Sequence, residues 1–317
     1  MNPLHISVII ASYNSRATIE RCLKSLKNQK TTREFEVIVV DTSTDGTGDF
    51  VEKQFPWVKV RRFLKRKFAG GARNVGISIA RGKIIALLDA DCEAAEDWLE
   101  EIAKAHESPW PAVGGTIDNA NPDSYVGWAA YFCEFGQWMP GTESKYLDDI
   151  AGANMSYKRD VFDVYGLFIT GTYCSDTHLH WRLAKNGHHL RFVPSITVSH
   201  HNIQGLEKFL KHEFFHGRCF ARVRLRFHGF SKWKRTIYVV LSPLIAVKLF
   251  LKVLLLCFRN KNKKYLKPFF KSAPLVFLGI LCWSLGETLV YAGLDASGLT
   301  IESQSGNTQP LRHNYDE

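Results

Sequence analysis

The chain has 317 residues, of which 45% are hydrophobic and 23% charged, a balance that excludes a disordered or fibrous protein. Its formal net charge of +10 comes from the last third, because residues 1–200 carry 23 Lys and Arg against 24 Asp and Glu, whereas residues 201–317 carry 18 against 7. Those late basic residues alternate with two long apolar segments, a pattern that favours an anionic membrane surface over nucleic acid as a partner.

Cysteine usage indicates a reducing compartment. The 7 cysteines are scattered singly, with no C-x-x-C pair, which argues against a structural zinc site and against a disulfide scaffold. Residues Met1–His5 lack the basic stretch and the apolar core of a secretory signal. We therefore expect the N-terminal part of the chain to lie in the cytoplasm.

Strand and helix patterns alternate from the N-terminus. A strand is predicted over 6–10, an amphipathic helix over 19–26 and a second strand over 37–40, which together form a βαβ unit. Such a unit predicts parallel strands with right-handed crossovers. Further strands are predicted over 58–60 and 84–88, and further helices over 50–55, 70–80, 98–105 and from 175 to a stop at Gly187. The predicted fold class is α/β, with a mostly parallel sheet flanked by helices.

Three acidic residues follow two of these strands: Asp41 after the first crossover, and Asp89 and Asp91 further on. For any one of them, a simple helix cap is the plainer interpretation. Two carboxylates one residue apart repel, however, unless a cation or basic group lies between them, and no Lys or Arg occurs over 87–96. Because ligands bind at the carboxyl edge of such sheets, the pattern favours a divalent cation that holds an anionic ligand such as a nucleoside diphosphate.

Two late segments, 237–258 and 274–294, are each long enough to cross the hydrocarbon layer. The first contains Pro243, Lys248 and Lys252 and has basic residues on both sides, which conflicts with a simple crossing under the positive-inside rule. This favours an interfacial or re-entrant first segment with only the second spanning, and a two-helix hairpin is the alternative. An aromatic run over 125–138 is interpreted as core in preference to a sugar-stacking surface.

Several sequence blocks, in their order, resemble the inverting glycosyltransferases of family 2, which have the GT-A fold. The resemblance covers roughly residues 5–205. The blocks are Ser7–Asn14, Val39–Asp41 with Ser43–Thr47, Gly70–Gly76, the Asp89-Ala90-Asp91 of a DxD motif, Gly152–Ser156 and Ser175–Asp176. The fold implied is a Rossmann-like nucleotide-diphospho-sugar transferase domain, here followed by C-terminal hydrophobic membrane helices.

The resemblance also implies roles for individual residues. It assigns nucleotide-sugar contacts to Ala11, Tyr13, Asp41, Arg73 and Asp89. It assigns Mg²⁺ or Mn²⁺ to Asp91 with Asp89 and His200, where His200 is a better match than its neighbour His201. It makes Asp176 the general base for the acceptor hydroxyl and places Gly152 and Asn154 on the acceptor side.

The chain departs from the family pattern at two places. The family usually has Glu-Asp where this chain has Ser175-Asp176, so the candidate base is present and the neighbouring glutamate is absent. The QxxRW motif of processive members is absent at 204–208, which favours a single-sugar transferase over a polymerase.

These features divide the chain into a catalytic domain and a membrane-directed third. The expected parts are a catalytic domain over 1–205 (nucleotide-sugar binding over about 5–110, acceptor and base region over about 111–205), a basic juxtamembrane segment over 206–236, two membrane segments within 237–294, and a polar tail over 295–317. We expect a membrane-attached, metal-dependent, inverting glycosyltransferase of polysaccharide or glycolipid biosynthesis. Its donor would be a UDP, GDP or dTDP sugar and its acceptor a lipid or lipid-linked sugar, with no nucleic acid involved.

Other activities fit less well. A haloacid-dehalogenase-like phosphatase needs its DxD motif near the start of the chain and Thr or Val where this chain has Glu93. A nucleotidyltransferase needs a glycine-rich basic loop after the first strand, and residues 11–15 lack it. A catalytically silent membrane scaffold, or a nucleotide-sugar-binding protein on the same fold, remains the alternative, although such a protein would be expected to lose its metal or base carboxylates.

Overall fold

The computed structural model describes residues 5–295 and contains a 9-stranded sheet. The strand order is β3-β2-β1-β4-β8-β6-β9-β5, and β7 also pairs with β9. The strands are β1 (Ile6–Ser12), β2 (Phe35–Asp41), β3 (Lys59–Arg62), β4 (Ile84–Leu88), β5 (Cys92–Ala94), β6 (Ala112–Asn119), β7 (Lys145–Leu147), β8 (Asn154–Lys158) and β9 (Leu190–His200). All the predicted strands are present. The predicted tail over 295–317 lies outside the described residues except for Asp295.

The first four strands of the sheet run parallel, as predicted, and the remainder is mixed. β1 pairs in parallel with β2 and β4, so the residues after these strands meet at one edge. β8 is antiparallel to both β4 and β6, whereas β9 is parallel to β6. The short strand β5 pairs antiparallel with the end of β9 and sets Cys92 opposite His200. This pairing brings the end of β9 to the acids that follow β4.

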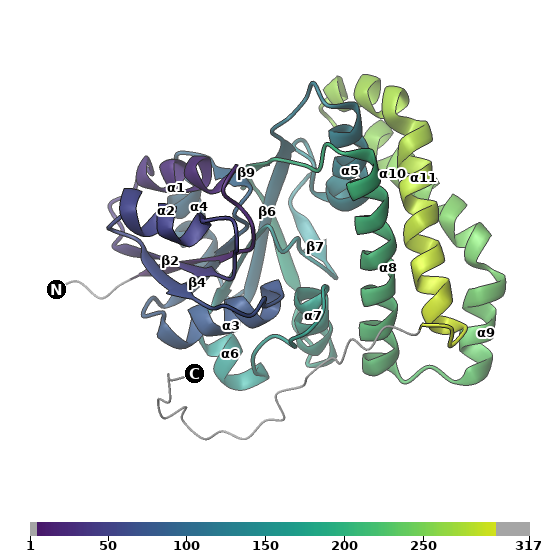
Figure 1. Ribbon diagram of the computed structural model, residues 1–317, viewed down its shortest axis with the longest axis horizontal. Coiled ribbons are helices and arrows are strands. Elements are labelled where there is room, and N and C mark those ends of the chain that lie inside the picture. The colour runs from purple at the N-terminus through teal and green to yellow at the C-terminus, as the bar shows by residue number, and fades with distance from the viewer. Residues whose placement is uncertain (1–4, 296–317) are drawn as a thin grey trace.

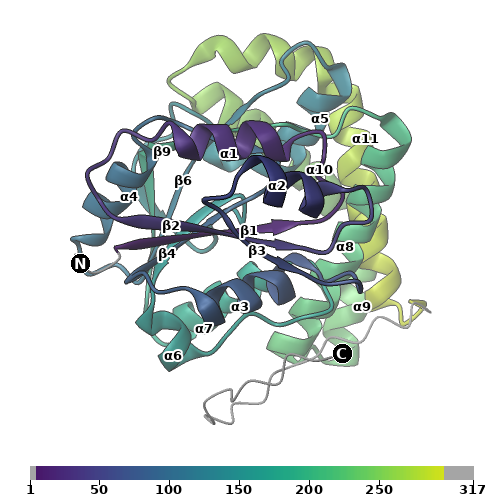
Figure 2. The ribbon, with the colours of Figure 1, turned by 60° about the vertical axis from the view of Figure 1, so that its left-hand side comes forward.

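Helices cover both faces of the sheet, as Figures 1 and 2 show. Alternate strand residues face opposite sides, so Ile10 packs in the cluster that contains Leu23 and Leu99, whereas Ile9 packs with Ile77 and others on the second face. The helices around the sheet are α1 (Ile19–Lys27), α2 (Thr47–Gln54), α3 (Ala69–Ile79), α4 (Trp98–His106), α6 (Asp160–Tyr165) and α7 (Ser175–Lys185). The α/β class and the GT-A-like arrangement are therefore confirmed.

A second layer of long helices packs beside the sheet domain (Figure 1). It consists of α5 (Tyr125–Phe135) with the short 3₁₀ helix η1 (Gly136–Trp138), α8 (Leu206–His228), α9 (Lys232–Val240), α10 (Ser242–Arg259), η2 (Lys263–Tyr265) and α11 (Leu266–Tyr291). Of the aromatic run, Tyr131, Phe132, Phe135 and Trp138 are buried as predicted, whereas Tyr125 at its start is exposed. At Gly217 of α8 a Cβ atom would collide with the backbone carbonyl of Trp283, so glycine lets α8 and α11 approach closely.

The two predicted membrane segments have different structures. The first is broken at Leu241, where α9 and α10 meet at a bend of 65°, so it is not one straight helix. The second overlaps the helical stretch Lys263–Tyr291, which is long and apolar enough to cross a membrane, although 44% of its most apolar part is buried inside the protein. Within residues 5–295, helix length and composition therefore allow one membrane crossing, or two if α9 and α10 together form a second, bent span.

Asn154 is a structural junction between three parts of the sheet domain. It is only 1% exposed, and its Nδ2 atom donates to the backbone carbonyls of Thr116 and Ile196, each at 2.9 Å. Its Oδ1 atom accepts from Nε1 of Trp98 at 2.9 Å. The β6–β9 register shifts between Gly115 and Thr116, so this side chain satisfies carbonyls that the ladder leaves unpaired.

We expect Asn154→Ala to lower the free energy of unfolding by about 3 kcal/mol or more, because it leaves buried hydrogen-bonding groups without partners. Thermal denaturation of the purified protein in detergent measures this loss. The control is Asn186→Ala, since the exposed Asn186 side chain bonds only the Arg182 carbonyl of its own helix and its loss should change stability by less than about 0.5 kcal/mol. Equal effects of the two substitutions would contradict the structural role of Asn154.

Candidate active site

Arg73 of α3 provides the positive charge that the sequence around the two acids lacks. Its Nη2 atom donates to Oδ1 of Asp89 at 2.8 Å and to the carbonyl of Gly152 at 2.9 Å. Burial raises the pKa of Asp89, Arg73 opposes this rise, and the neighbouring Asp91 adds to it, with a net shift above the usual value. Arg73 is itself buried. It is thus neither a surface arginine nor open to a nucleotide; it fixes Asp89.

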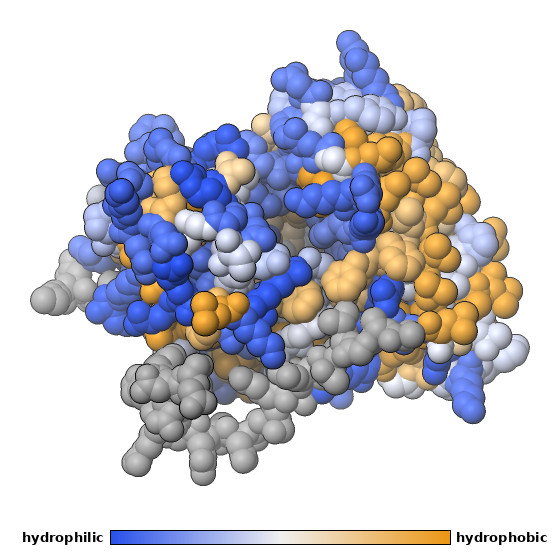
Figure 3. All heavy atoms as spheres, in the orientation of Figure 1, coloured by the Kyte–Doolittle hydropathy of each residue, from blue (hydrophilic) through white to orange (hydrophobic). Residues whose placement is uncertain are grey.

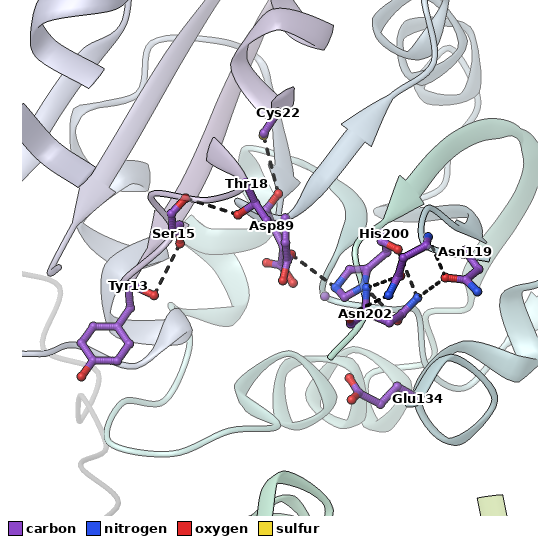
Figure 4. A network of polar contacts seen from close by, with 12 residues as sticks. Tyr13, Ser15, Thr18, Cys22, Asp89, Asn119, Glu134, His200 and Asn202 are labelled. Carbon is purple, nitrogen blue, oxygen red and sulfur yellow. Dashed lines mark hydrogen bonds and ion pairs between the residues drawn. The ribbon is translucent and has the colours of Figure 1, made fainter. Parts of the chain in front are cut away.

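Asp91 faces a different partner, His200, at the end of β9, and Figure 4 shows the His200 ring beside Asn202. Oδ1 of Asp91 and Nε2 of His200 lie 3.3 Å apart, and Nδ1 of His200 is bonded to Oδ1 of Asn202 at 3.0 Å. Because an amide oxygen only accepts, Nδ1 carries a proton and Nε2 is the atom directed at Asp91. Burial alone would lower the pKa of His200, but the Asp91 carboxylate raises it to about 9.

The neighbouring histidine, His201, is directed elsewhere. Its Nε2 atom lies 2.5 Å from Oε1 of Glu93, away from Asp91. Only its backbone N–H reaches the DxD segment, where it donates to the carbonyl of Asp91 at 2.9 Å. The geometry therefore separates the two histidines that the sequence places side by side.

The pair of Asp91 and His200 fits a divalent cation. Oδ1 of Asp91 is buried and pairs with Nε2 of His200, and a divalent cation that displaced the Nε2 proton would take both atoms as ligands. A carboxylate oxygen and an imidazole nitrogen oriented by Asn202 suit Mn²⁺ or Mg²⁺. Cys92 also lies within reach of this pair, but burial raises the pKa of its thiol well above the usual value and keeps it protonated. Asp89 is the weaker of the two predicted acidic ligands, because Arg73 occupies one of its oxygens.

A cleft of about 230 Å³ opens beside these acids at the carboxyl edge of β1 and β4. Of the predicted nucleotide-sugar residues, Ala11, Tyr13 and Asp89 line it. Tyr13 is 41% exposed, and the guanidinium carbon of Arg66 lies 4.1 Å from its ring centroid. The cleft also contains side chains that the sequence did not single out, namely Arg66, Lys67, Phe68 and Tyr173.

Asp41 lies deeper than a ligand contact requires. Only 1% of it is exposed, and its Oδ1 atom accepts from Oγ of Ser43 at 2.6 Å. It does not line the cleft. In this arrangement Asp41 holds the loop after β2, and Ser43 in turn accepts from the backbone N–H of Asn14 at 2.7 Å.

Asp176 stands in the first turn of α7, next to the Arg73 guanidinium. A Cβ atom at Gly152 would lie 2.5 Å from Oδ2 of Asp176 and 3.2 Å from Nη2 of Arg73, so glycine makes room for both groups. The preceding Ser175 is buried against Gly70 of α3. Of the two predicted acceptor-side residues, Gly152 therefore touches the candidate base, whereas Asn154 is enclosed in the core and has no atom free for an acceptor.

A carboxylate that the sequence did not single out anchors this helix. Asp149 accepts from Oγ1 of Thr177 at 2.8 Å and from Nδ1 of His180, both within about one turn of Asp176. Nε2 of His180 is bonded to Oη of Tyr157 at 2.6 Å. The sequence signal for Asp149 is weak, because the acid lies in an irregular loop. For Arg66 and Lys67 a signal was present, the basic triplet over 65–67 that precedes the glycine-rich helix.

Comparison with known proteins identifies the family. The family described as glycosyl transferase family 2 matches residues 7–166, half of the chain. Glycosyltransferase AglE of Haloferax volcanii is 29% identical over 67% of this chain and 72% of its own length. A glucosyl-dolichyl phosphate glucuronosyltransferase of the same organism is 30% identical over 32% of this chain and 34% of its own length.

A solved structure supports the fold over nearly the whole chain. The mannosyltransferase PcManGT of Pyrobaculum calidifontis, solved with GDP-Man and Mn²⁺, superposes with a TM-score of 0.55 over 88% of this chain and 86% of its own. The two sequences are 19% identical, so this similarity shows a shared fold and nothing more.

We expect His200→Gln to weaken Mn²⁺ binding by about tenfold or more, because the substitution removes a ligand nitrogen. Even the loss of a residue that only orients a metal ligand lowers metal affinity by about 10- to 100-fold. Electron paramagnetic resonance of free Mn²⁺ during a titration gives the dissociation constant. His201→Gln is the matched control and should change the constant by less than about twofold. Equal losses in the two variants would contradict the assignment.

Proposed function

The chain belongs to glycosyl transferase family 2 and is a glycosyltransferase that takes its sugar from a nucleotide sugar, and we propose that it transfers one sugar, with inversion, to a hydroxyl of a lipid-linked acceptor. The observation that supports the chemistry is the placement of Asp176 beside Arg73, whose guanidinium pairs with Asp89 of the cleft. An in-line displacement needs a base close to a diphosphate site.

We assign the donor site to the cleft over β1 and β4. Asp91 and His200 would hold Mn²⁺ or Mg²⁺, which supplies positive charge to the leaving diphosphate. Arg66 and Lys67 lie in the same cleft and add positive charge where a diphosphate would stand. Arg73 keeps Asp89 in place from behind, and Tyr13 offers an aromatic surface at the rim. Mn²⁺ in the structure of the mannosyltransferase supports this choice of cofactor.

Asp176 is proposed as the general base. Asp149 and His180 hold the first turn of α7, and Gly152 leaves space in front of the Asp176 carboxylate. The acceptor hydroxyl would lose its proton to Asp176 as its oxygen attacks the anomeric carbon from the face opposite the diphosphate. The product then has the anomeric configuration opposite to that of the donor. Since the chain lacks the QxxRW motif, we propose a single transfer per acceptor and no processive elongation.

We propose that the protein is attached to the cytoplasmic surface of a membrane by α9, α10 and α11. Apolar side chains exposed on these helices form one surface, which we call the apolar face and which is visible in orange over the helical layer in Figure 3. Its members include Trp233, Ile237, Val240, Leu241, Leu244, Val247, Leu251, Leu255, Phe258, Phe270, Leu278, Leu281 and Leu285. On α10 their spacing is that of a single helical stripe, as in helices that lie in the interface.

Contacts along α11 favour this in-plane arrangement over a crossing. Just before its first turn, Tyr265 donates to Asp118 of β6 at 2.8 Å, which ties this end to the sheet domain. Towards its other end, Glu287 lies 3.3 Å from Arg224 of α8. The two ends of α11 are thus tied to the remainder of the protein, one to β6 of the sheet domain and the other to α8 of the helical layer. A crossing would also carry the arginines of α8 to the depth of the bilayer core, which is costly.

The acceptor is proposed to be lipid-linked because the apolar face would hold the cleft near the bilayer surface. A relative whose name describes glucosyl-dolichyl phosphate as its substrate supports this class of acceptor. The 7 cysteines are all free, as suits a cytoplasmic protein.

For the attachment, we expect cysteines placed at Lys261 and at the exposed Lys232 to react equally with an impermeant maleimide in sealed inside-out vesicles. These positions lie at opposite ends of the α9–α11 layer, so a crossing by α11 would protect one of the two. The unsubstituted chain serves as the background, because most of its own thiols are buried. Protection of one position with full labelling of the other would contradict the in-plane arrangement.

For the chemistry, we expect one of UDP, GDP or dTDP to raise the melting temperature by roughly 5 °C at a hundred times its dissociation constant, and only with Mn²⁺. Asp176→Asn should keep this shift in melting temperature, because the donor site is intact. It should lower kcat for sugar transfer by about 10²- to 10⁴-fold, because the general base is missing.

Asp91→Asn is the comparison variant and should lose the nucleotide shift itself. No shift with any nucleotide, together with no transfer, would favour the silent scaffold. Full transfer by Asp176→Asn would overturn the assignment of the base.

A further inference from the structure

A second pocket lies between the sheet domain and the apolar face. It measures about 210 Å³ and is enclosed by α5 with η1, α8, α10 and α11. Leu249, Val253 and Leu256 of α10 form one apolar wall, and Ile280 of α11 belongs to the opposite one. The outer side of α10 carries part of the apolar face, so this one helix separates the pocket from the proposed membrane surface.

The inner end of the pocket is polar. Glu134, Glu213 and His216 line it. Glu213 is only 3% exposed, and its Oε1 atom has no hydrogen-bond partner among residues 5–295. Burial, reinforced by Glu134, raises the pKa of Glu213 well above the usual range, so its carboxyl is protonated. A buried polar group without a partner is costly unless a ligand supplies one.

This polar end adjoins the candidate active site. Oε1 of Glu134 lies 3.3 Å from Nε2 of His212. The ring of Tyr173, which lines the donor cleft, lies 5.7 Å from the ring of His212 and 6.1 Å from that of His216. Phe135, next to Glu134, has its ring 4.6 Å from that of His200, and Figure 4 shows Glu134 close to the His200 group. His216 of the pocket and Tyr173 of the cleft are therefore neighbours, so the pocket and the cleft meet at these two rings.

We propose that this pocket binds the acceptor, and that the acceptor is a lipid-linked sugar whose hydroxyls meet Glu134, Glu213 and His216 while its apolar chain lies along α10. This inference rests on the function proposed above and names its acceptor class. Carboxyl groups are natural partners for sugar hydroxyls, whereas an anionic head placed against Glu134 would be repelled.

The test is photolabelling of the full chain in a detergent without a sugar head group. The probe is decyl β-glucoside with a diazirine at the end of its chain, and labelled peptides are located by mass spectrometry. We expect labelling of α10 and α11 around Val253 and Ile280, with competition by unlabelled decyl β-glucoside and not by decyl phosphate. Leu256→Trp fills the pocket and should lower this labelling about tenfold. Leu255→Trp, on the exposed side of the same helix, should leave it unchanged.

Three outcomes would overturn the inference: labelling confined to the exposed side of α10, equal labelling in both variants, or competition by decyl phosphate alone, which would indicate a bare lipid phosphate. The thermal shift with nucleotide and Mn²⁺ is measured on the same Leu256→Trp protein. If Leu256→Trp keeps the thermal shift and is labelled as strongly as the wild type, the pocket is rejected and the donor site stands. If the wild-type protein itself shows no thermal shift, the proposed function is rejected.

Discussion

The repulsion between Asp89 and Asp91 is the constraint around which the catalytic edge is built. Two carboxylates one residue apart, at the end of a buried strand, need compensation that their own segment does not contain. The fold supplies it from two sides: Arg73 of α3 pairs with Asp89, and His200 of β9 faces Asp91. Nη2 of the buried Arg73 donates to Oδ1 of Asp89 at 2.8 Å, whereas Asp91 faces Nε2 of His200 at 3.3 Å. Because His200 can give up its proton to a metal and Arg73 cannot, we propose Asp91 as the acid that takes the metal.

Local patterns were sufficient to predict the N-terminal half of the fold. Strands such as β1, β2 and β4 are buried on both faces, so their continuous apolar runs are plain in the sequence. The candidate residues nearest to these strands, Tyr13 and Asp89, do line the cleft. Two other motif positions proved less direct: the side chain of Asp41, the last residue of β2, supports a loop, and the side chain of Asn154 supports neighbouring strands.

The remainder depends on contacts between distant segments, which no local pattern encodes. The Arg73 pairing joins α3 to the DxD loop, and the β5–β9 register decides that His200 and not His201 faces Asp91. The sequence showed two apolar segments of spanning length, but only the packing shows that α11, which holds most of the second segment, is tied to β6 near its start and to α8 near its end. The pocket between α5, α8, α10 and α11 arises from four segments far apart in the chain.

The most direct measurement is an anomalous difference map from crystals of the protein grown with Mn²⁺ and the nucleoside diphosphate that binds it. The predicted result is a single metal peak between the Asp91 carboxylate and Nε2 of His200, with Asp89 still paired to Arg73. A metal held by Asp89 and Asp91 together, with Arg73 released towards the diphosphate, would contradict the division of roles between the two acids on which the proposed mechanism depends.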